Sequence, residues 1–128
     1  MTIQNFISYG KQNIDEEDIQ AVIDTLRSPY LTQGPKIAEF ERAIAEYVGT
    51  KYAVAFTNGT AALHGACYAA GIGVGDEVIT SPITFAASAN CVRYVGGSVV
   101  FADIDQYTYN INPEEIRKKI TSKTKAII

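Results

Sequence analysis

The sequence predicts an α/β fold in which helices alternate with the strands of a mostly parallel sheet. Short apolar runs bounded by turn-forming residues alternate along the chain with segments whose apolar residues recur at helical spacing. Hydrophobic residues make up 47% of the 128 residues and charged residues 20%, which is enough apolar material for a packed core. No internal repeat or low-complexity tract interrupts the alternation. Such an order of elements is typical of helices layered on a parallel sheet.

Residues 1–50 are expected to form an N-terminal helical segment. A first helix begins after Asp15, a favourable N-cap residue, and ends before Pro29, because proline disfavours a helical residue in front of it. Pro35 suits the first position of a second helix, since its missing amide hydrogen would have no partner there, and Gly49 closes that helix.

Residues 51–128 are expected to form the first part of an α/β domain that is cut off at its C-terminal end. The expected strands are residues 52–56, 77–80, 98–101 and 126–128, and the expected helices are residues 61–70, 85–94 and 113–120. Because the last strand looks like the first half of a core strand, we expect the chain to be the N-terminal part of a longer protein.

Composition excludes several classes of protein. Lys and Arg total 11 against 14 Asp and Glu, and this net charge of −3 does not favour nucleic-acid binding. No stretch approaches the ~20 apolar residues that span a bilayer, and no signal peptide is recognisable, so we expect a cytoplasmic protein that has no membrane contact. Cys67 and Cys91 lie in apolar runs and are expected to be buried free thiols in a reducing compartment. With one His and no Cys-x-x-Cys motif, no metal site is expected.

The segment 57–60 is the first candidate for a ligand site. It reads Thr-Asn-Gly-Thr and lies between an expected strand and a helix N-terminus, where free amides and the positive end of the helix dipole suit a phosphate. Gly59 lets the backbone approach an anion closely, and the Thr60 hydroxyl adds a donor. Taken alone, the pattern is more typical of a structural turn. Neither a correctly placed G-x-G-x-x-G nor a P-loop Lys-Ser/Thr pair is present.

Three further features have alternative interpretations. Phe85 follows the C-terminal end of an expected strand, where open α/β sheets bind ligands, so it can stack on a planar ring or pack in the core. His64 has no visible partner and is expected to be structural. Asp103 and Asp105 fit either a carboxylate pair or a polar turn after a strand.

Several motifs together resemble a known family. They occur in order at the expected separations and read LTQGP (residues 31–35), TNGTAAL (57–63), GDEVITSPITF (75–85) and TKAII (124–128). The combination resembles the DegT/DnrJ/EryC1/StrS nucleotide-sugar aminotransferases, which use pyridoxal 5′-phosphate (PLP) and have fold type I. The resemblance implies the N-terminal part of the fold type I large domain, a three-layer αβα structure. Tyr9, with the LTQG and PITF segments, is most similar to the aminotransferases of pseudaminic acid synthesis.

The resemblance implies roles for particular residues. The amides of Gly59 and Thr60, with the Thr60 hydroxyl, would hold the cofactor phosphate, and Phe85 would stack on the pyridine ring. Asn58 stands where many members have serine, so it weakens or replaces one hydrogen bond at that phosphate. The residues expected to border the sugar-nucleotide site are Tyr9, Pro29, Tyr30, Leu31, Thr32 and Gly59.

The family activity implied is amino transfer, with glutamate as the expected donor, to a UDP-linked 4-keto-6-deoxy-N-acetylhexosamine, by a homodimer that makes glycan precursors. The lysine that bonds to the cofactor is expected beyond Ile128, because none of the seven lysines here has a matching context. We therefore expect no catalytic residue within 1–128 and no activity from this piece alone. Two alternatives stay open: a sugar dehydratase of the same family, in which histidine replaces that lysine, and a non-catalytic module that binds a phosphate ligand or a partner protein.

Overall fold

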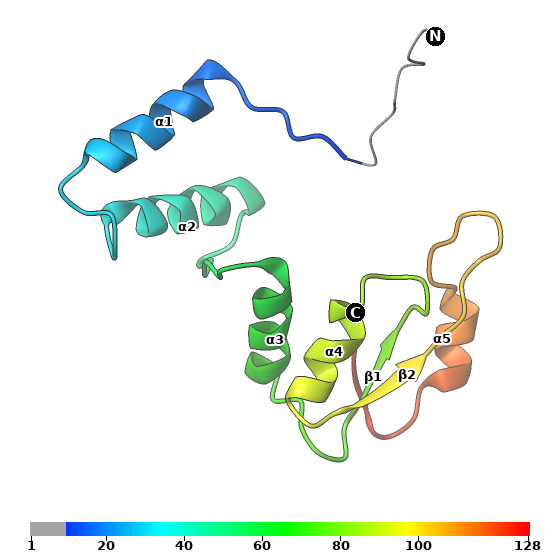
Figure 1. Ribbon diagram of the computed structural model, residues 1–128. Helices are drawn as coiled ribbons and strands as arrows, with labels where there is room; N and C mark the ends of the chain where they lie inside the picture. The colour runs from blue at the N-terminus through cyan, green and yellow to red at the C-terminus, as the bar shows by residue number, and fades with distance from the viewer. Residues whose placement is uncertain (1–9) are drawn as a thin grey trace, which may run out of the picture. The chain divides into compact units, whose positions relative to one another are not determined.

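The computed structural model describes residues 10–128, and the chain divides between Val54 and Ala55 into two compact units (Figure 1). The first unit carries helices α1 (Glu16–Arg27) and α2 (Pro35–Val48). Within the described residues, no helix has the length and apolar content needed to cross a membrane.

The two helices of the first unit begin and end where the sequence predicts. The Asp15 carboxylate accepts hydrogen bonds from the amides of Glu17 at 2.9 Å and Asp18 at 3.0 Å. The Asp18 side chain in turn accepts from the Asp15 amide at 3.2 Å, which completes a reciprocal capping box. α2 has proline at its first position and ends at Gly49, whose φ of 71° is left-handed and therefore favours glycine.

The second unit is built on a three-stranded parallel sheet. The strands are β1 (Glu77–Thr80), β2 (Ser98–Phe101) and β3 (Thr124–Ile127), in the spatial order β2-β1-β3. Val78 pairs with Val99 on one side and Ala126 on the other, so the central strand has both edges filled. The predicted α/β class with a parallel sheet is confirmed.

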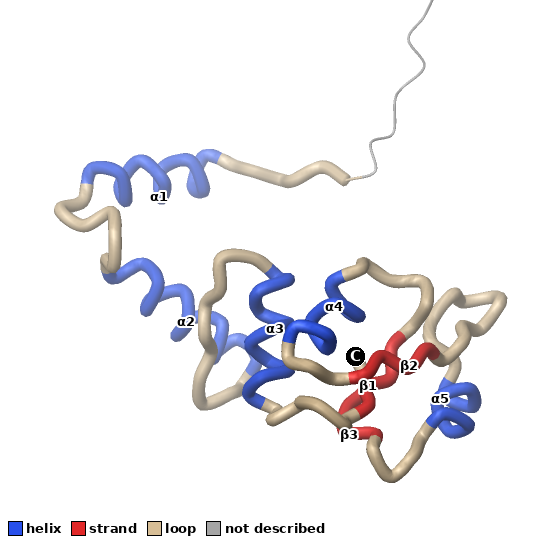
Figure 2. The backbone as a smooth tube through the Cα atoms, turned by 60° about the horizontal axis from the view of Figure 1, so that its bottom comes forward, coloured by secondary structure: helices blue, strands red, loops and turns tan. Residues whose placement is uncertain are grey.

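Helices cover both faces of this sheet, as Figures 1 and 2 show. α3 (Gly59–Ala69) precedes β1, and α4 (Ala87–Tyr94) connects β1 to β2 on the same face. α5 (Pro113–Lys119) connects β2 to β3 on the opposite face. Parallel neighbours require such crossover connections, because each strand must begin at the same end of the sheet as its neighbour.

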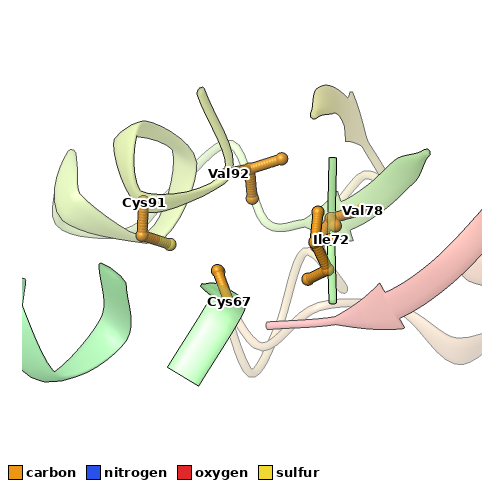
Figure 3. Packing of buried hydrophobic residues seen from close by; sticks show 5 residues of the cluster. All are labelled: Cys67, Ile72, Val78, Cys91 and Val92. Carbon is orange, nitrogen blue, oxygen red and sulfur yellow. The ribbon is translucent and has the colours of Figure 1, made fainter. Parts of the chain in front are cut away.

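The core of the second unit lies between α3, α4 and the sheet (Figure 3). Its buried members come from both helices, from β1 and from the turn before it: Cys67, Ile72, Val78, Cys91 and Val92. Leu63, Val95, Val99 and Ala126 pack around them. Both cysteines are free and buried, as predicted.

One predicted strand is wrong. Residues 52–56 form no strand, and Tyr52 and Val54 are 75% and 70% exposed. The short apolar run in this segment indicates β propensity, but a strand also needs a hydrogen-bonded neighbour. No strand in the described part of the chain pairs with it.

Smaller differences concern element ends. α3 begins at Gly59, two residues before the predicted start, because Asn58 caps it. α4 begins at Ala87 where residue 85 was predicted, and β3 begins at Thr124, ahead of the predicted residue 126.

Candidate functional site

Asn58 organises the start of α3. Its backbone is extended, with φ −166°, and its side-chain oxygen accepts a hydrogen bond from the Ala61 amide at 2.9 Å. Its carbonyl oxygen accepts from the Ala62 amide at 3.1 Å. The two Asn58 oxygens therefore bond to the amides of Ala61 and Ala62, whereas Gly59 and Thr60, the first two residues of the helix, have amides that no carbonyl of the helix can reach. Because its side-chain oxygen is engaged as an acceptor, the Asn58 carboxamide nitrogen remains a donor.

The space above Gly59 is open. A Cβ atom added at this glycine would meet no heavy atom within 4 Å, so a ligand can approach the backbone closely. Asn58 and Gly59 are exposed, and Thr60 is half-buried. No acidic residue lies in the first turn of α3, so nothing there opposes the positive end of the helix dipole. These donors and this open backbone fit a phosphate group, including that of PLP.

Phe85 lies in the loop that leaves the carboxyl end of β1. The residue is 77% exposed and is therefore not part of the core of the second unit. The loop is held by the Phe85 carbonyl, which accepts from the Ser88 amide at 3.0 Å, and by a 3.0 Å hydrogen bond between the Thr84 and Ser88 hydroxyls. An exposed ring on a fixed loop is free to stack on a planar ligand.

The start of α3 and the Phe85 loop lie at the same end of the second unit, beyond the carboxyl end of β1 (Figure 1). This follows from chain direction, because α3 and α4 both run back toward the end of the sheet where the strands begin. The carboxyl end of the strands is where open α/β sheets bind ligands.

The link between α1 and α2 contains Pro29, Tyr30, Leu31 and Thr32. It is shaped by Gly34, where an added Cβ would lie 2.6 Å from the Tyr30 carbonyl oxygen. Tyr30 and Leu31 are 66% and 63% exposed, so their side chains are available for contact. These residues belong to the first unit, whereas Gly59 and Phe85 belong to the second. Tyr9, the other predicted substrate contact, lies outside the described residues.

Asp103 and Asp105 form a polar turn after β2. One Asp105 carboxylate oxygen accepts from the amides of Thr108 at 2.9 Å and Tyr107 at 3.0 Å, and from the Thr108 hydroxyl at 3.1 Å. The amide of Thr108, followed by that of Tyr107, lowers the pKa of Asp105 from its ordinary value. Asp103 accepts from the amide of Ile104 at 2.8 Å. Of the two interpretations, the turn explains these carboxylates.

His64 has a structural partner. Its ring lies 5.3 Å from that of Tyr94 in an edge-on arrangement, which joins α3 to α4. Among the described residues, no group of three or more His, Cys, Asp or Glu side chains is placed to hold a metal ion.

Thr80, the last residue of β1, is a buried polar residue that no sequence motif singles out. Its side chain is fully buried, and its hydroxyl has no hydrogen-bond partner in the described part of the chain. A threonine that follows two apolar residues at the end of a strand is a weak signal, since many such hydroxyls bond to the backbone nearby.

The second unit thus places the start of α3 and the Phe85 loop beyond the carboxyl end of its central strand, where α/β proteins that bind ligands have their sites. The chain belongs to the DegT/DnrJ/EryC1/StrS aminotransferase family, whose model matches residues 12–128. This assignment confirms the resemblance seen in the motifs at the level of the family.

Individual relatives are similar to this chain in sequence and in structure. The chain is 48% identical over 124 residues to the spore coat polysaccharide biosynthesis protein SpsC of Bacillus subtilis (strain 168), covering 97% of this chain and 32% of SpsC. A protein of Streptococcus pneumoniae described as a sugar aminotransferase, Spr1654, matches in its PLP-form with a TM-score of 0.86 and 37% identity over 94% of this chain and 31% of that one.

PseC of Helicobacter pylori, an aminotransferase involved in the biosynthesis of pseudoaminic acid, matches with a TM-score of 0.83 and 36% identity. The match covers 94% of this chain and 33% of PseC. The chain therefore spans about a third of the length of these relatives.

Proposed function

We propose that the full-length protein is a PLP-dependent aminotransferase that converts a UDP-linked 4-keto-6-deoxy-N-acetylhexosamine into its 4-amino sugar. Glutamate is the amino donor, and the enzyme acts as a homodimer in the synthesis of a surface glycan precursor. Residues 51–128 are the first part of its PLP-binding domain, and residues 1–50 are a helical segment in front of it. The observation that carries the proposal is the pair of amides of Gly59 and Thr60 at the open start of α3, in a chain of this family.

The second unit of this chain supplies the phosphate-binding part of the site. The amides of Gly59 and Thr60 and the Thr60 hydroxyl donate to the phosphate, and the positive end of the α3 dipole adds to their attraction. The carboxamide nitrogen of Asn58 is a further donor, since its oxygen is held by Ala61. Phe85 stacks on one face of the pyridine ring.

PLP, when bound, supplies an electron sink that stabilises negative charge on the carbon that gains or loses the amino group. The residues of this chain fix the cofactor at its phosphate and along one face of its ring, so that the ring presents a constant orientation to the substrate. The lysine that bonds to the cofactor belongs to the polypeptide beyond residue 128. Without it, the 128-residue chain alone does not transfer amino groups.

The substrate is proposed from two relatives and one segment. PseC is described as an aminotransferase of pseudoaminic acid biosynthesis, and SpsC is named for the biosynthesis of spore coat polysaccharide. Both of these compounds are made from sugars. Tyr9, with the link Pro29, Tyr30, Leu31 and Thr32 and the backbone at Gly59, borders the sugar nucleotide. The exposed rings and apolar side chains of the link suit contact with a uracil and a deoxysugar.

The test is a product assay on the full-length protein. Incubation with PLP, glutamate and UDP-4-keto-6-deoxy-N-acetylglucosamine is followed by mass spectrometry. We expect a product in which an amino group replaces the keto oxygen, together with an equal amount of 2-oxoglutarate. A product that has lost a hydroxyl group instead would identify the dehydratase, and bound cofactor without any turnover would identify a binding module.

A matched pair of variants links this assay to the described site. Phe85 and Tyr107 are both exposed, at 77% and 82%, so neither Phe85→Leu nor Tyr107→Leu removes core packing. The first variant loses the ring that stacks on the cofactor and is expected to lose turnover at least tenfold, while the second keeps wild-type turnover. Equal turnover in the two variants would remove Phe85 from the site.

A further inference from the structure

We propose that Phe56 is a positioning residue for the phosphate site: its ring rests on α3 at Gly65 and fixes the turn 57–60 in the orientation that presents its donors. This deepens the proposed function and rests on it, because the ligand of the turn is the phosphate of PLP. Both residues of the contact lie in the second unit, and Phe56 is not a member of the core cluster of that unit.

The ring of Phe56 lies directly against the backbone of α3. A Cβ atom added at Gly65 would lie 2.5 Å from the Cζ atom of the ring and 2.8 Å from its Cε1 atom. Carbon atoms pack at about 3.5–4.0 Å, so no side chain fits at Gly65 while the ring keeps this position. Phe56 and Gly65 line one hollow together with Ala61, His64 and Tyr68 of the same helix. The absence of a side chain at Gly65 is therefore what lets the ring reach the helix.

Glycine at this position weakens the helix that carries the site. Gly65 is the seventh of the 11 residues of α3, and glycine is the poorest helix former after proline. Gly65 is not among the glycines with a positive φ, so its backbone conformation does not require glycine. Within the described residues, the ring of Phe56 is the feature that requires it. The helix thus gives up intrinsic stability at the point where the ring makes its contact.

The contact between Phe56 and Gly65 encloses the turn 57–60 between two fixed points. Phe56 directly precedes this turn, and Gly65 lies in the second turn of the helix that follows it. An apolar residue ahead of the N-cap that packs on the helix fixes the angle at which the chain enters, as in the hydrophobic staple. Phe56 lies two residues before the N-cap Asn58 and is placed to act in the same way.

The entry angle decides how the donors of the turn are aligned. The amides of Gly59 and Thr60 are oriented by α3 itself, whereas the Asn58 carboxamide is carried by the chain that enters the helix. A hydrogen bond to a phosphate depends on the distance and the angle of its donor. The ring of Phe56 therefore aligns the carboxamide of the entering chain with the two amides of the helix, so that all three can meet one phosphate.

Two substitutions disturb the contact from its two sides. Gly65→Ala adds a methyl group that displaces the ring, and the ring can swing aside because the atoms it meets are the free end of a side chain. Alanine favours a helix more than glycine does, so α3 should stay folded. Phe56→Leu removes the ring atoms that face Gly65 and leaves a gap. In the double variant, the shorter leucine and the added methyl group fill the same space, so the contact is expected to return.

The measured quantity is the preference for PLP over pyridoxal, which is the ratio of their dissociation constants for the cofactor-free, full-length protein. Pyridoxal lacks the phosphate, so this ratio reports the phosphate site and not the stability of the fold. We expect the preference to fall about tenfold in each single variant and to return to within about threefold of wild type in the double variant. Gly73→Ala and Tyr107→Leu are the matched controls and should keep the wild-type preference. The Cβ atom added at Gly73 meets no heavy atom closer than the Val95 carbonyl oxygen at 4.0 Å.

The outcomes separate this proposal from the proposed function. A wild-type protein that binds PLP and pyridoxal equally would remove the phosphate site itself and overturn both. A wild-type preference that either folded single variant retains would overturn only the role of Phe56, as would a double variant whose preference is no higher than that of Gly65→Ala. The midpoint of urea unfolding shows whether each cofactor-free variant is folded, and one single variant decides the proposal if the other is not.

Discussion

Replacing Thr80 with valine is expected to stabilise the fold. The Thr80 side chain is fully buried at the end of β1, and its hydroxyl has no partner among the described residues. A buried hydroxyl that is left unpaired costs about 1–3 kcal/mol. Valine has the same shape with a methyl group in place of the hydroxyl, so Thr80→Val removes this cost without opening a cavity. We expect the free energy of unfolding to rise by about 1 kcal/mol.

Two control substitutions separate the hydroxyl from the methyl group of Thr80. Thr80→Ser keeps the unpaired hydroxyl and removes a buried methyl, which is expected to lower the free energy of unfolding by about 1 kcal/mol. Thr84→Val changes an exposed threonine whose hydroxyl is hydrogen-bonded to Ser88 at 3.0 Å, so it is expected to bring no gain.

Urea unfolding of the full-length protein, followed by circular dichroism, measures these differences. For Thr80→Val the transition midpoint should rise while the slope with urea stays the same, because the surface exposed on unfolding does not change. A fall of about 1 kcal/mol or more in the free energy of unfolding would refute the reasoning, since it would show that the hydroxyl has a partner.

Three further predictions concern the site and the turn after β2. Asn58→Asp keeps an N-cap oxygen for the Ala61 amide, so we expect an unchanged free energy of unfolding. It also brings a negative charge and removes the carboxamide donor, so the PLP affinity measured by fluorescence titration should fall at least tenfold. Equal affinity would contradict a phosphate at this position. The methyl group added by Gly59→Ala meets no heavy atom within 4 Å, so the free energy of unfolding should change by less than about 0.5 kcal/mol. The same methyl group should weaken PLP binding. Unchanged binding would place the phosphate elsewhere. The pKa of Asp105 is lowered from its ordinary value of 3.8, so the ionised carboxylate stabilises the fold above pH 3.8, and this stabilisation is lost as the pH falls through the lower folded value. In urea titrations, the advantage of wild type over Asp105→Asn should therefore be present at pH 7 and shrink below pH 3.8. An advantage that does not depend on pH would contradict this.

Local signals predicted the helices of the first unit well. The capping box that begins α1 and the proline and glycine that bound α2 act through the backbone groups of a few neighbouring residues. Such effects need no knowledge of the rest of the chain, so Asp15, Pro35 and Gly49 could be assigned from the sequence.

The failed strand at residues 52–56 shows where local signals end. This segment is a short apolar run like β2, yet of the two only β2 pairs with β1. Pairing depends on which segments of the chain lie side by side, and this is a tertiary property that the pattern of one segment does not contain.

The candidate site was predictable in part. The turn at 57–60 and Phe85 were recognised because they combine glycine, small hydroxyl residues and an aromatic at strand ends. The cap formed by Asn58 was open to prediction, since asparagine is among the best N-cap residues, but the helix was expected to start at Ala61. The unpaired hydroxyl of Thr80 and the core cluster that brings Cys67 of α3 and Cys91 of α4 together depend on packing between separate elements, which the sequence does not state.

The most direct test of the phosphate site compares two ligands that differ in one group. Purified full-length protein, freed of cofactor, is titrated with PLP and with pyridoxal, which lacks the phosphate. If the start of α3 holds the phosphate, PLP should bind at least 100-fold more tightly, and most of this advantage should disappear in Asn58→Asp. Equal affinity for the two ligands, or an advantage that Asn58→Asp leaves intact, would contradict this assignment.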